Sequence, residues 1–229
     1  MGCPVISRDA SGKALLEILN LGDESSERDA LIVKFSVSNY EKMESADLAS
    51  ILLRVSAAGE KTAGQVYGKI PKEVWPKIGF PDLKRLVQRW VDAKNNATAL
   101  KIAQNWFDAH TAPDGAGATG KELREILMLL PESTERDQLV HKIPGSDYDA
   151  MNGAEGAAIL SLLSSTGYGE VPKEVWSKIG FSDLKRLVKS WVNRNGSTAL
   201  KIAQSWFDAH TAPDDAGAAG NELREILML

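Results

Sequence analysis

Residues Pro71–Asp114 read PKEVWPKIGFPDLKRLVQRWVDAKNNATALKIAQNWFDAHTAPD, and residues Pro172–Asp214 read PKEVWSKIGFSDLKRLVKSWVNRNGSTALKIAQSWFDAHTAPD. The two stretches align without a break except for one residue lost in the loop after Trp191. Self-similarity of this kind marks a tandem array, in which each repeat is one structural module. The repeated stretch therefore indicates the architecture of the chain, and it contains no catalytic constellation.

The repeat extends beyond this stretch. A Leu-rich segment occurs three times, and its glycines lie 108 and 100 residues apart, at Gly12, Gly120 and Gly220. Most of the difference between the two spacings lies between Arg54 and Pro71, where the first unit is longer. We expect a first unit at residues 12–119 and a second at 120–219. Residues 220–229 would be the opening helix of a third unit, packed on unit 2 as residues 121–130 would pack on unit 1.

The composition is that of an ordinary globular protein. Of the 229 residues, 43% are hydrophobic and 25% are charged, so two modules of about 100 residues can each bury a core. A net charge of −4 gives no basic field, and we expect neither nucleic acid nor a membrane as a partner. The single Cys3 excludes an internal disulfide framework, and no stretch reaches the roughly 20 apolar residues of a membrane span.

The apolar residues recur with the period of a helix. In Phe80–Val91 they occupy one helical face, at Phe80, Leu83, Leu86, Val87, Trp90 and Val91. Nothing alternates with period two for long enough to indicate a strand. The sequence therefore predicts an all-α fold. It would consist of two tandem helical-bundle repeats of about 100 residues, stacked through a shared linking helix.

All six tryptophans belong to the repeat. They could form an aromatic binding surface or the structural core, and each lies on the apolar face of its helix. Because burial of a large aromatic ring is a major stabilising term, we assign them to the core. The predicted core residues are Trp75, Trp90, Trp106, Trp176, Trp191 and Trp206.

Two Asp-Ala-His sequences are the best candidates for chemistry, at Asp108–His110 and Asp208–His210. A metal site would need a third ligand with convincing spacing, and the sequence offers none. A histidine near a helix C-terminus is also favoured by the helix dipole, so we interpret both pairs as capping. We therefore expect no catalytic, metal-binding or cofactor-binding residues. Asn96 and Asn195 begin glycosylation sequons, a pattern that a polar loop between helices also produces.

The repeat resembles the WY fold of RXLR effectors from oomycetes. The resemblance rests on a pattern of the form P-x-x-V-aromatic-x-x-I-G-F, followed by a helix that ends in Trp-Val and an Ala/Leu-rich helix with an aromatic residue. These positions are Val74, Trp75, Ile78, Phe80, Leu86, Trp90 and Val91 in unit 1, and Val175, Trp176, Ile179, Phe181, Leu187, Trp191 and Val192 in unit 2. The aromatic partner in the following helix would be Trp106 or Phe107, and Trp206 or Phe207.

The roughly 100-residue period, with an extra Leu-rich helix joining the units, is similar to the tandem LWY variety of this family. The sequence has no RxLR tetrapeptide or EER run, and a Trp/Phe pair stands where the family has a tyrosine. The resemblance implies a non-enzymatic protein that is secreted by a plant pathogen and acts inside host cells. Some tandem members recruit a host serine/threonine phosphatase core enzyme.

We therefore expect an interaction module that binds a host protein and modulates plant immunity, and we expect a monomer. Surface residues that differ between the units are the candidates for partner binding. They are Arg89, Asp92 and Asn105 in unit 1, with Ser190, Asn193 and Ser205 in unit 2, and the longer segment 57–68. The alternatives are an all-α repeat scaffold of another family, a metal-dependent enzyme using the Asp-x-His pairs, and a purely structural spacer.

Overall fold

The computed structural model describes residues 12–21, 26–34, 40, 43–55, 60–110, 118–142, 151–210 and 225–226. Within these residues the regular secondary structure is helical, which confirms the predicted all-α class. The chain divides into two compact units, Met1–Gly115 and Ala116–Leu229. None of the described helices is both long enough and apolar enough to cross a membrane.

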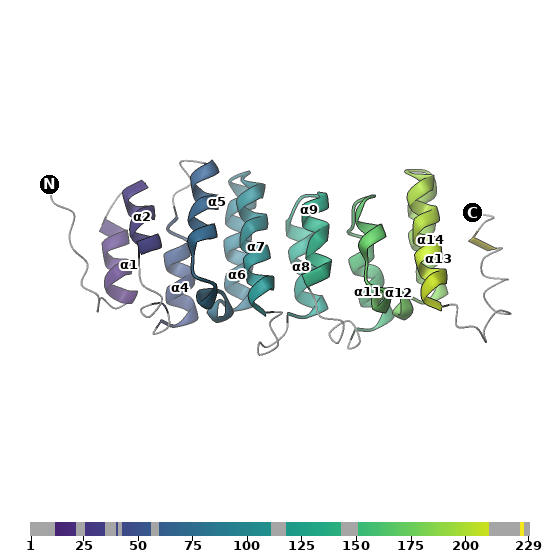
Figure 1. Cartoon of the computed structure of the whole chain (residues 1–229), viewed down its shortest axis with the longest axis horizontal. Coiled ribbons are helices and arrows are strands. Elements are labelled where there is room, and N and C mark those ends of the chain that lie inside the picture. Colours follow the sequence, from purple (N-terminus) through teal and green to yellow (C-terminus); the bar gives the residue numbers. More distant parts are fainter. Residues whose placement is uncertain are drawn as a thin grey trace. The chain divides into compact units, whose positions relative to one another are not determined.

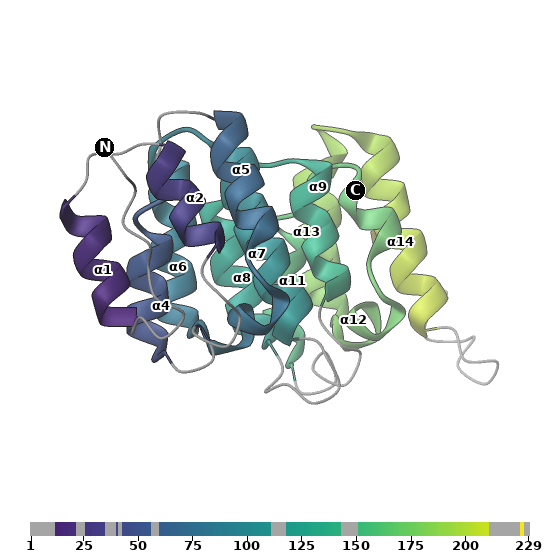
Figure 2. The same ribbon diagram turned by 60° about the vertical axis from the view of Figure 1, so that its left-hand side comes forward.

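The helices of unit 1 pack in pairs around a common core. α6 and α7 lie side by side, α5 packs on α7, and α4 contacts both α1 and α6 (Figures 1 and 2). The elements are α1 (Gly12–Leu21), α2 (Ser26–Lys34), α4 (Ser45–Leu52), α5 (Glu60–Lys69), the short 3-10 helix η1 (Lys72–Lys77), α6 (Phe80–Asp92) and α7 (Asn96–His110).

Unit 2 repeats this packing with α13 beside α14 and with α11 between α8 and α13. Its elements are α8 (Gly120–Leu129), α9 (Thr134–Asp137), η2 (Gln138–Lys142), α11 (Gly153–Leu160), η3 (Gly167–Glu170), α12 (Lys173–Lys178), α13 (Phe181–Val192) and α14 (Gly196–His210).

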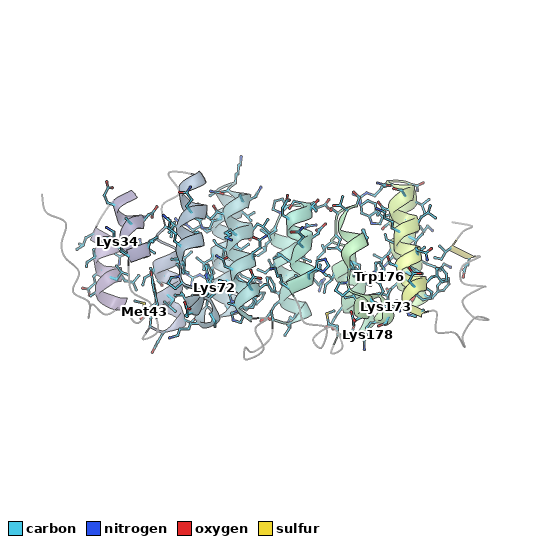
Figure 3. All side chains as sticks on the ribbon, viewed as in Figure 1. Lys34, Met43, Lys72, Lys173, Trp176 and Lys178 are labelled. Atoms are coloured by element: carbon cyan, nitrogen blue, oxygen red, sulfur yellow. The ribbon has the colours of Figure 1, made fainter. Side chains whose placement is uncertain are left out.

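The face predicted from the spacing of α6 is the face that is buried. Leu83, Leu86, Val87 and Trp90 lie in the core, and Phe80 is half-buried at the helix start. The short α12 shows the same division, because Trp176 is buried while Lys173 is exposed (Figure 3). The apolar stripe therefore fixes which side of each helix faces its unit.

Capping boxes begin two helices of unit 2. The Thr119 side chain accepts a hydrogen bond from the backbone N–H of Glu122, whose carboxylate accepts one from the backbone N–H of Thr119. Asn152 and Glu155 form the same reciprocal pair at the start of α11. Such boxes satisfy N–H groups that have no partner within the helix, which explains why α8 and α11 begin where they do.

The extra length of unit 1 lies in α5. In unit 2 the corresponding position, before Pro172, is the four-residue helix η3. Of the predicted partner segment 57–68, residues 57–59 lie outside the described part of the chain.

The predicted opening helix of a third unit is described only at Glu225 and Ile226, which are helical. Ile226 is buried, and the Glu225 carboxylate accepts a hydrogen bond from the Lys185 ammonium of α13. The other residues of 220–229 lie outside the described part of the chain.

Candidate functional site

A tyrosine lies at the centre of the unit 1 core. The Trp90 indole N–H donates to the Tyr67 hydroxyl oxygen at 2.9 Å, and that hydroxyl donates to the Leu52 carbonyl at 2.7 Å. The Tyr67 and Trp90 rings meet edge to face, with centroids 5.9 Å apart. This chain of bonds joins α5, α6 and the end of α4, so it satisfies the buried polar atoms and fixes the packing of three helices.

The same arrangement occurs in unit 2. The Trp191 indole N–H donates to the Tyr168 hydroxyl at 2.9 Å, and the hydroxyl donates to the Leu160 carbonyl at 2.6 Å. The third tryptophan of each unit donates to a backbone carbonyl at 2.6 Å, Trp106 to Ile78 and Trp206 to Ile179. The two cores are therefore built from equivalent contacts.

The six tryptophans are buried to different degrees. Trp191 is half-buried, and the other five have relative exposures of 1–3%: Trp75, Trp90, Trp106, Trp176 and Trp206. None of the five can form the exposed aromatic surface that was the alternative to a core.

Sequence reasoning missed the two tyrosines. The resemblance placed the aromatic partner in the helix after Trp90, and Trp106 of that helix does contact Phe80, with centroids 5.9 Å apart. Trp90 itself pairs with Tyr67 of α5, which precedes it in the chain. A signal was present, because a Tyr-Gly pair stands four residues before the repeated proline in both units. Burial raises the pKa of the Tyr67 phenol, and it raises that of Tyr168 to about 12.

The two histidines are held by their own helices. The His110 Nδ1–H donates to the Trp106 carbonyl at 2.9 Å, and the ring stacks on the Trp106 indole with centroids 3.8 Å apart. His210 makes the same bond and stack with Trp206. Among the described residues, no group of three or more His, Cys, Asp or Glu side chains could hold a metal ion. The geometry gives both histidines a structural role at the last helical turn.

The predicted partner-binding residues fall into two groups. Arg89 and Asn105 are half-buried and donate to carbonyls of their own unit, Arg89 to Val55 at 2.9 Å and Asn105 to Tyr67 at 3.1 Å. Ser205 is also half-buried, and the exposed residues of the set are Asp92, Ser190 and Asn193. Arg89 and Asn105 thus contribute to the structure of unit 1, independently of any role in partner binding.

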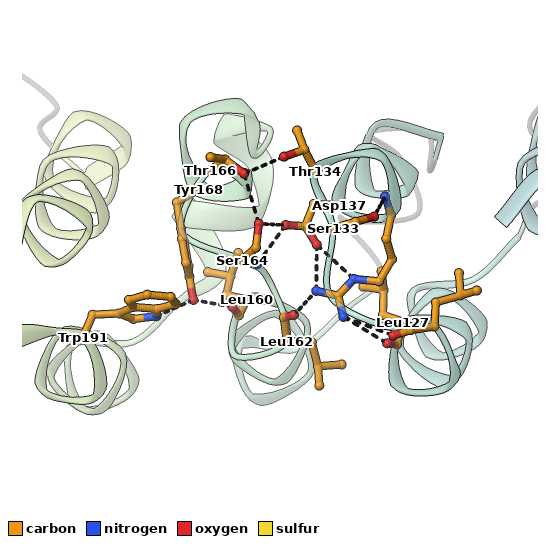
Figure 4. Close-up of polar contacts among 12 residues, drawn as sticks. Leu127, Ser133, Thr134, Asp137, Leu160, Leu162, Ser164, Thr166, Tyr168 and Trp191 are labelled. Atoms are coloured by element: carbon orange, nitrogen blue, oxygen red, sulfur yellow. Dashed lines mark hydrogen bonds and ion pairs between the residues drawn. The ribbon is translucent and has the colours of Figure 1, made fainter. Parts of the chain in front are cut away.

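A buried ion pair anchors the start of unit 2 (Figure 4). The Arg136 guanidinium bonds the Asp137 carboxylate at 2.8 Å and also donates to the carbonyls of Leu130 and Leu162. The second Asp137 oxygen accepts from the backbone N–H of Ser164 at 2.8 Å and from its hydroxyl. Arg136 and Asp137 are 3% and 4% exposed, so this network joins α8, α9 and the loop after α11 inside the unit.

Comparisons with protein family models, with curated proteins and with solved structures found no match to this chain.

Proposed function

We propose that this chain is the interaction module of a secreted pathogen effector, similar to the tandem WY/LWY type, that acts in the host cell and modulates plant immunity without enzymatic activity. In this proposal the two units are repeats stacked through a shared linking helix, α8. The proposal rests on the sequence resemblance and on how the differences between the units are distributed.

One observation carries the proposal. Along α6 and α13 every buried position of α6 has the same residue in both units, whereas the substitutions occur at exposed or half-buried positions. The substituted pairs are Pro81/Ser182, Gln88/Lys189, Arg89/Ser190 and Asp92/Asn193. A repeat array with a fixed core and a varied surface is typical of proteins that bind other proteins.

The packing of the motif residues supports the same interpretation. Val74, Trp75 and Ile78 are at most 1% exposed, and their unit 2 equivalents are similarly buried. In both units a tryptophan of the motif is paired with a tyrosine. This tyrosine precedes the tryptophan in the sequence, which is a difference from the order that the resemblance implied.

The partner is a host protein, and the resemblance makes a serine/threonine phosphatase core enzyme the first to test. We propose that the chain binds it as a monomer. The candidate binding residues are the exposed Asp92 in unit 1 and the exposed Ser190 and Asn193 in unit 2.

The test is direct binding of the full chain to purified plant phosphatase core enzyme, measured by biolayer interferometry. The discriminating variant combines Asp92→Asn with Asn193→Asp, because it exchanges exposed residues and leaves both the cores and the net charge unchanged. We expect wild-type binding and a loss of at least about tenfold in the exchanged variant. The matched control is Gln204→Ala, at an exposed position of α14, which should bind like wild type.

Absence of binding would exclude the phosphatase core enzyme as the partner. Capture from plant extract followed by mass spectrometry would then test other host proteins. If no extract protein binds wild type more strongly than the exchanged variant, the interaction proposal is wrong.

A further inference from the structure

Four arginines of unit 1 line one cavity of about 390 Å³. They come from three separate elements: Arg28 from α2, Arg54 from the turn after α4, and Arg85 and Arg89 from α6. Ser50 and Leu53 complete the lining. We propose that this cavity, the arginine pocket, binds a phosphate monoester.

The pocket is built into the fold of unit 1. Arg28 is 7% exposed and donates to the Arg54 carbonyl at 2.5 Å, and Arg89 donates to the Val55 carbonyl at 2.9 Å. The Arg89 guanidinium also lies 5.0 Å from the centroid of the Trp90 ring. A guanidinium carries its five N–H donors in a rigid fork, so a bond to a fixed backbone carbonyl holds the orientation of the whole group at the cavity.

The other two arginines of the lining are exposed to solvent. The Arg54 side chain is exposed and forms no ion pair with any residue that the structure describes. Arg85 is 66% exposed and bonds Asp82 at 3.4 Å, a long contact between neighbouring turns of α6. Such a contact is weak and solvent-screened, so a ligand anion can compete for Arg85.

The charge of the pocket selects the class of ligand. The four guanidinium groups of the lining outnumber the neighbouring carboxylates of Asp29 and Asp82, so the cavity is positive although the whole chain has a net charge of −4. A carboxylate has one negative charge and two oxygens, whereas a phosphate monoester has about two charges and three accepting oxygens at neutral pH. The phosphate group therefore matches converging arginines from several elements better than a carboxylate does.

Unit 2 contains the natural control. At the positions of Arg54 and Arg89 it has Leu162 and Ser190, while Arg28 and Arg85 correspond to Arg136 and Arg186. Arg136 is buried in its ion pair with Asp137. Unit 2 thus keeps the structural arginine and lacks two of the four that line the pocket in unit 1.

The test uses the full chain, O-phospho-L-serine as the probe, and nuclear magnetic resonance of the arginine Nε–Hε groups at low salt. We expect saturable shifts in wild type. The double variant Arg54→Leu/Arg89→Ser introduces the residues that unit 2 carries at these positions, and it should bind at least about tenfold more weakly. The matched control Lys189→Gln/Arg194→Ala removes the same charge from unit 2 and should bind like wild type.

A reciprocal variant distinguishes a loss of binding from a loss of folding. Leu162→Arg/Ser190→Arg places the two missing arginines in unit 2 and should create a second binding event in an otherwise unchanged chain. Equal shifts with sodium acetate, no shifts with phosphoserine, or wild-type affinity in Arg54→Leu/Arg89→Ser would each overturn the proposal.

Two further probes identify the source of the phosphate. A phosphoserine peptide that binds more tightly than phosphoserine indicates a phosphorylated protein, with the unphosphorylated peptide as its control. Equal affinities for the peptide and for phosphoserine indicate a small phosphorylated molecule. Both results support the pocket, and neither depends on the phosphatase interaction proposed above.

Discussion

At the scale of single residues, Lys94 stands out because its backbone is left-handed, with φ of 57°. It follows α6, where the Asn95 N–H donates to the Trp90 carbonyl and the Lys94 N–H to the Val91 carbonyl. This is the Schellman motif, in which glycine is the favoured left-handed residue. Lys94→Gly should therefore stabilise the protein by about 0.5–1 kcal/mol, measured by urea unfolding.

Asn193 is the matched control for this prediction. It lies at the end of α13 with φ of −82°, an ordinary conformation for any residue. Asn193→Gly should leave the free energy of unfolding unchanged or lower it. Equal stabilisation by both glycines would contradict the explanation from backbone strain.

The buried tyrosine hydroxyls make a second residue-scale prediction. In Tyr67→Phe the Trp90 indole N–H and the Leu52 carbonyl both lose a partner within the core, which should cost about 2 kcal/mol. Tyr168→Phe should cost less, because Trp191 is half-buried and water can replace the lost bond. Urea unfolding, monitored by tryptophan fluorescence, measures the free energy of unfolding of both variants. A larger loss of stability in Tyr168→Phe than in Tyr67→Phe would contradict this explanation.

The same burial predicts loss of stability in alkali. Below pH 10.0, the ordinary phenol pKa, Tyr168 is protonated in both the folded and unfolded states. Between pH 10 and about 12 only the unfolded state ionises, so the free energy of unfolding should fall by up to about 1.4 kcal/mol per pH unit for this group. Unfolding measured across this range should show a smaller slope in Tyr168→Phe than in wild type.

At the scale of elements, the Arg136–Asp137 pair holds α8 and α9 to the loop after α11. Asp137→Ala should cost about 3–5 kcal/mol, because it leaves the Arg136 guanidinium buried without its counter-ion. Ser164→Ala removes one hydroxyl bond to Asp137 and should cost about 1 kcal/mol. Thermal unfolding that ranks the two variants in the opposite order would show that the ion pair is not the main anchor.

The helical elements could be predicted from the sequence because their apolar residues recur with helical spacing. The Phe80–Val91 pattern indicated both α6 and its buried face. The tyrosines could not be found this way, since Tyr67 lies in α5 and Tyr168 in the 3-10 helix η3. Two elements of different length therefore place equivalent tyrosines against equivalent tryptophans, Trp90 and Trp191, and they share no common periodicity in the sequence.

The arginine pocket was also beyond sequence reasoning. Arg28, Arg54 and Arg89 are separated by 26 and 35 residues, and only the packing of α2, α4 and α6 brings them to one cavity. The comparison of units did mark Arg89 as a difference from Ser190. It gave no reason to connect that residue with Arg54.

At the scale of the whole molecule, the repeat raises the question of how unit 2 ends. Ile226 is 6% exposed, and Glu225 bonds Lys185 of α13, so part of the third Leu-rich segment contributes to this unit. The Lys185 and Glu225 side chains are 35% and 54% exposed, so water screens their ion pair and burial of Ile226 is the main stabilising term. Ile226→Ala should lower the free energy of unfolding by about 2 kcal/mol, and deletion of residues 220–229 should lower it at least as much. Glu225→Gln is the control and should have little effect; wild-type stability in both Ile226→Ala and the deletion would show that unit 2 is complete without this segment.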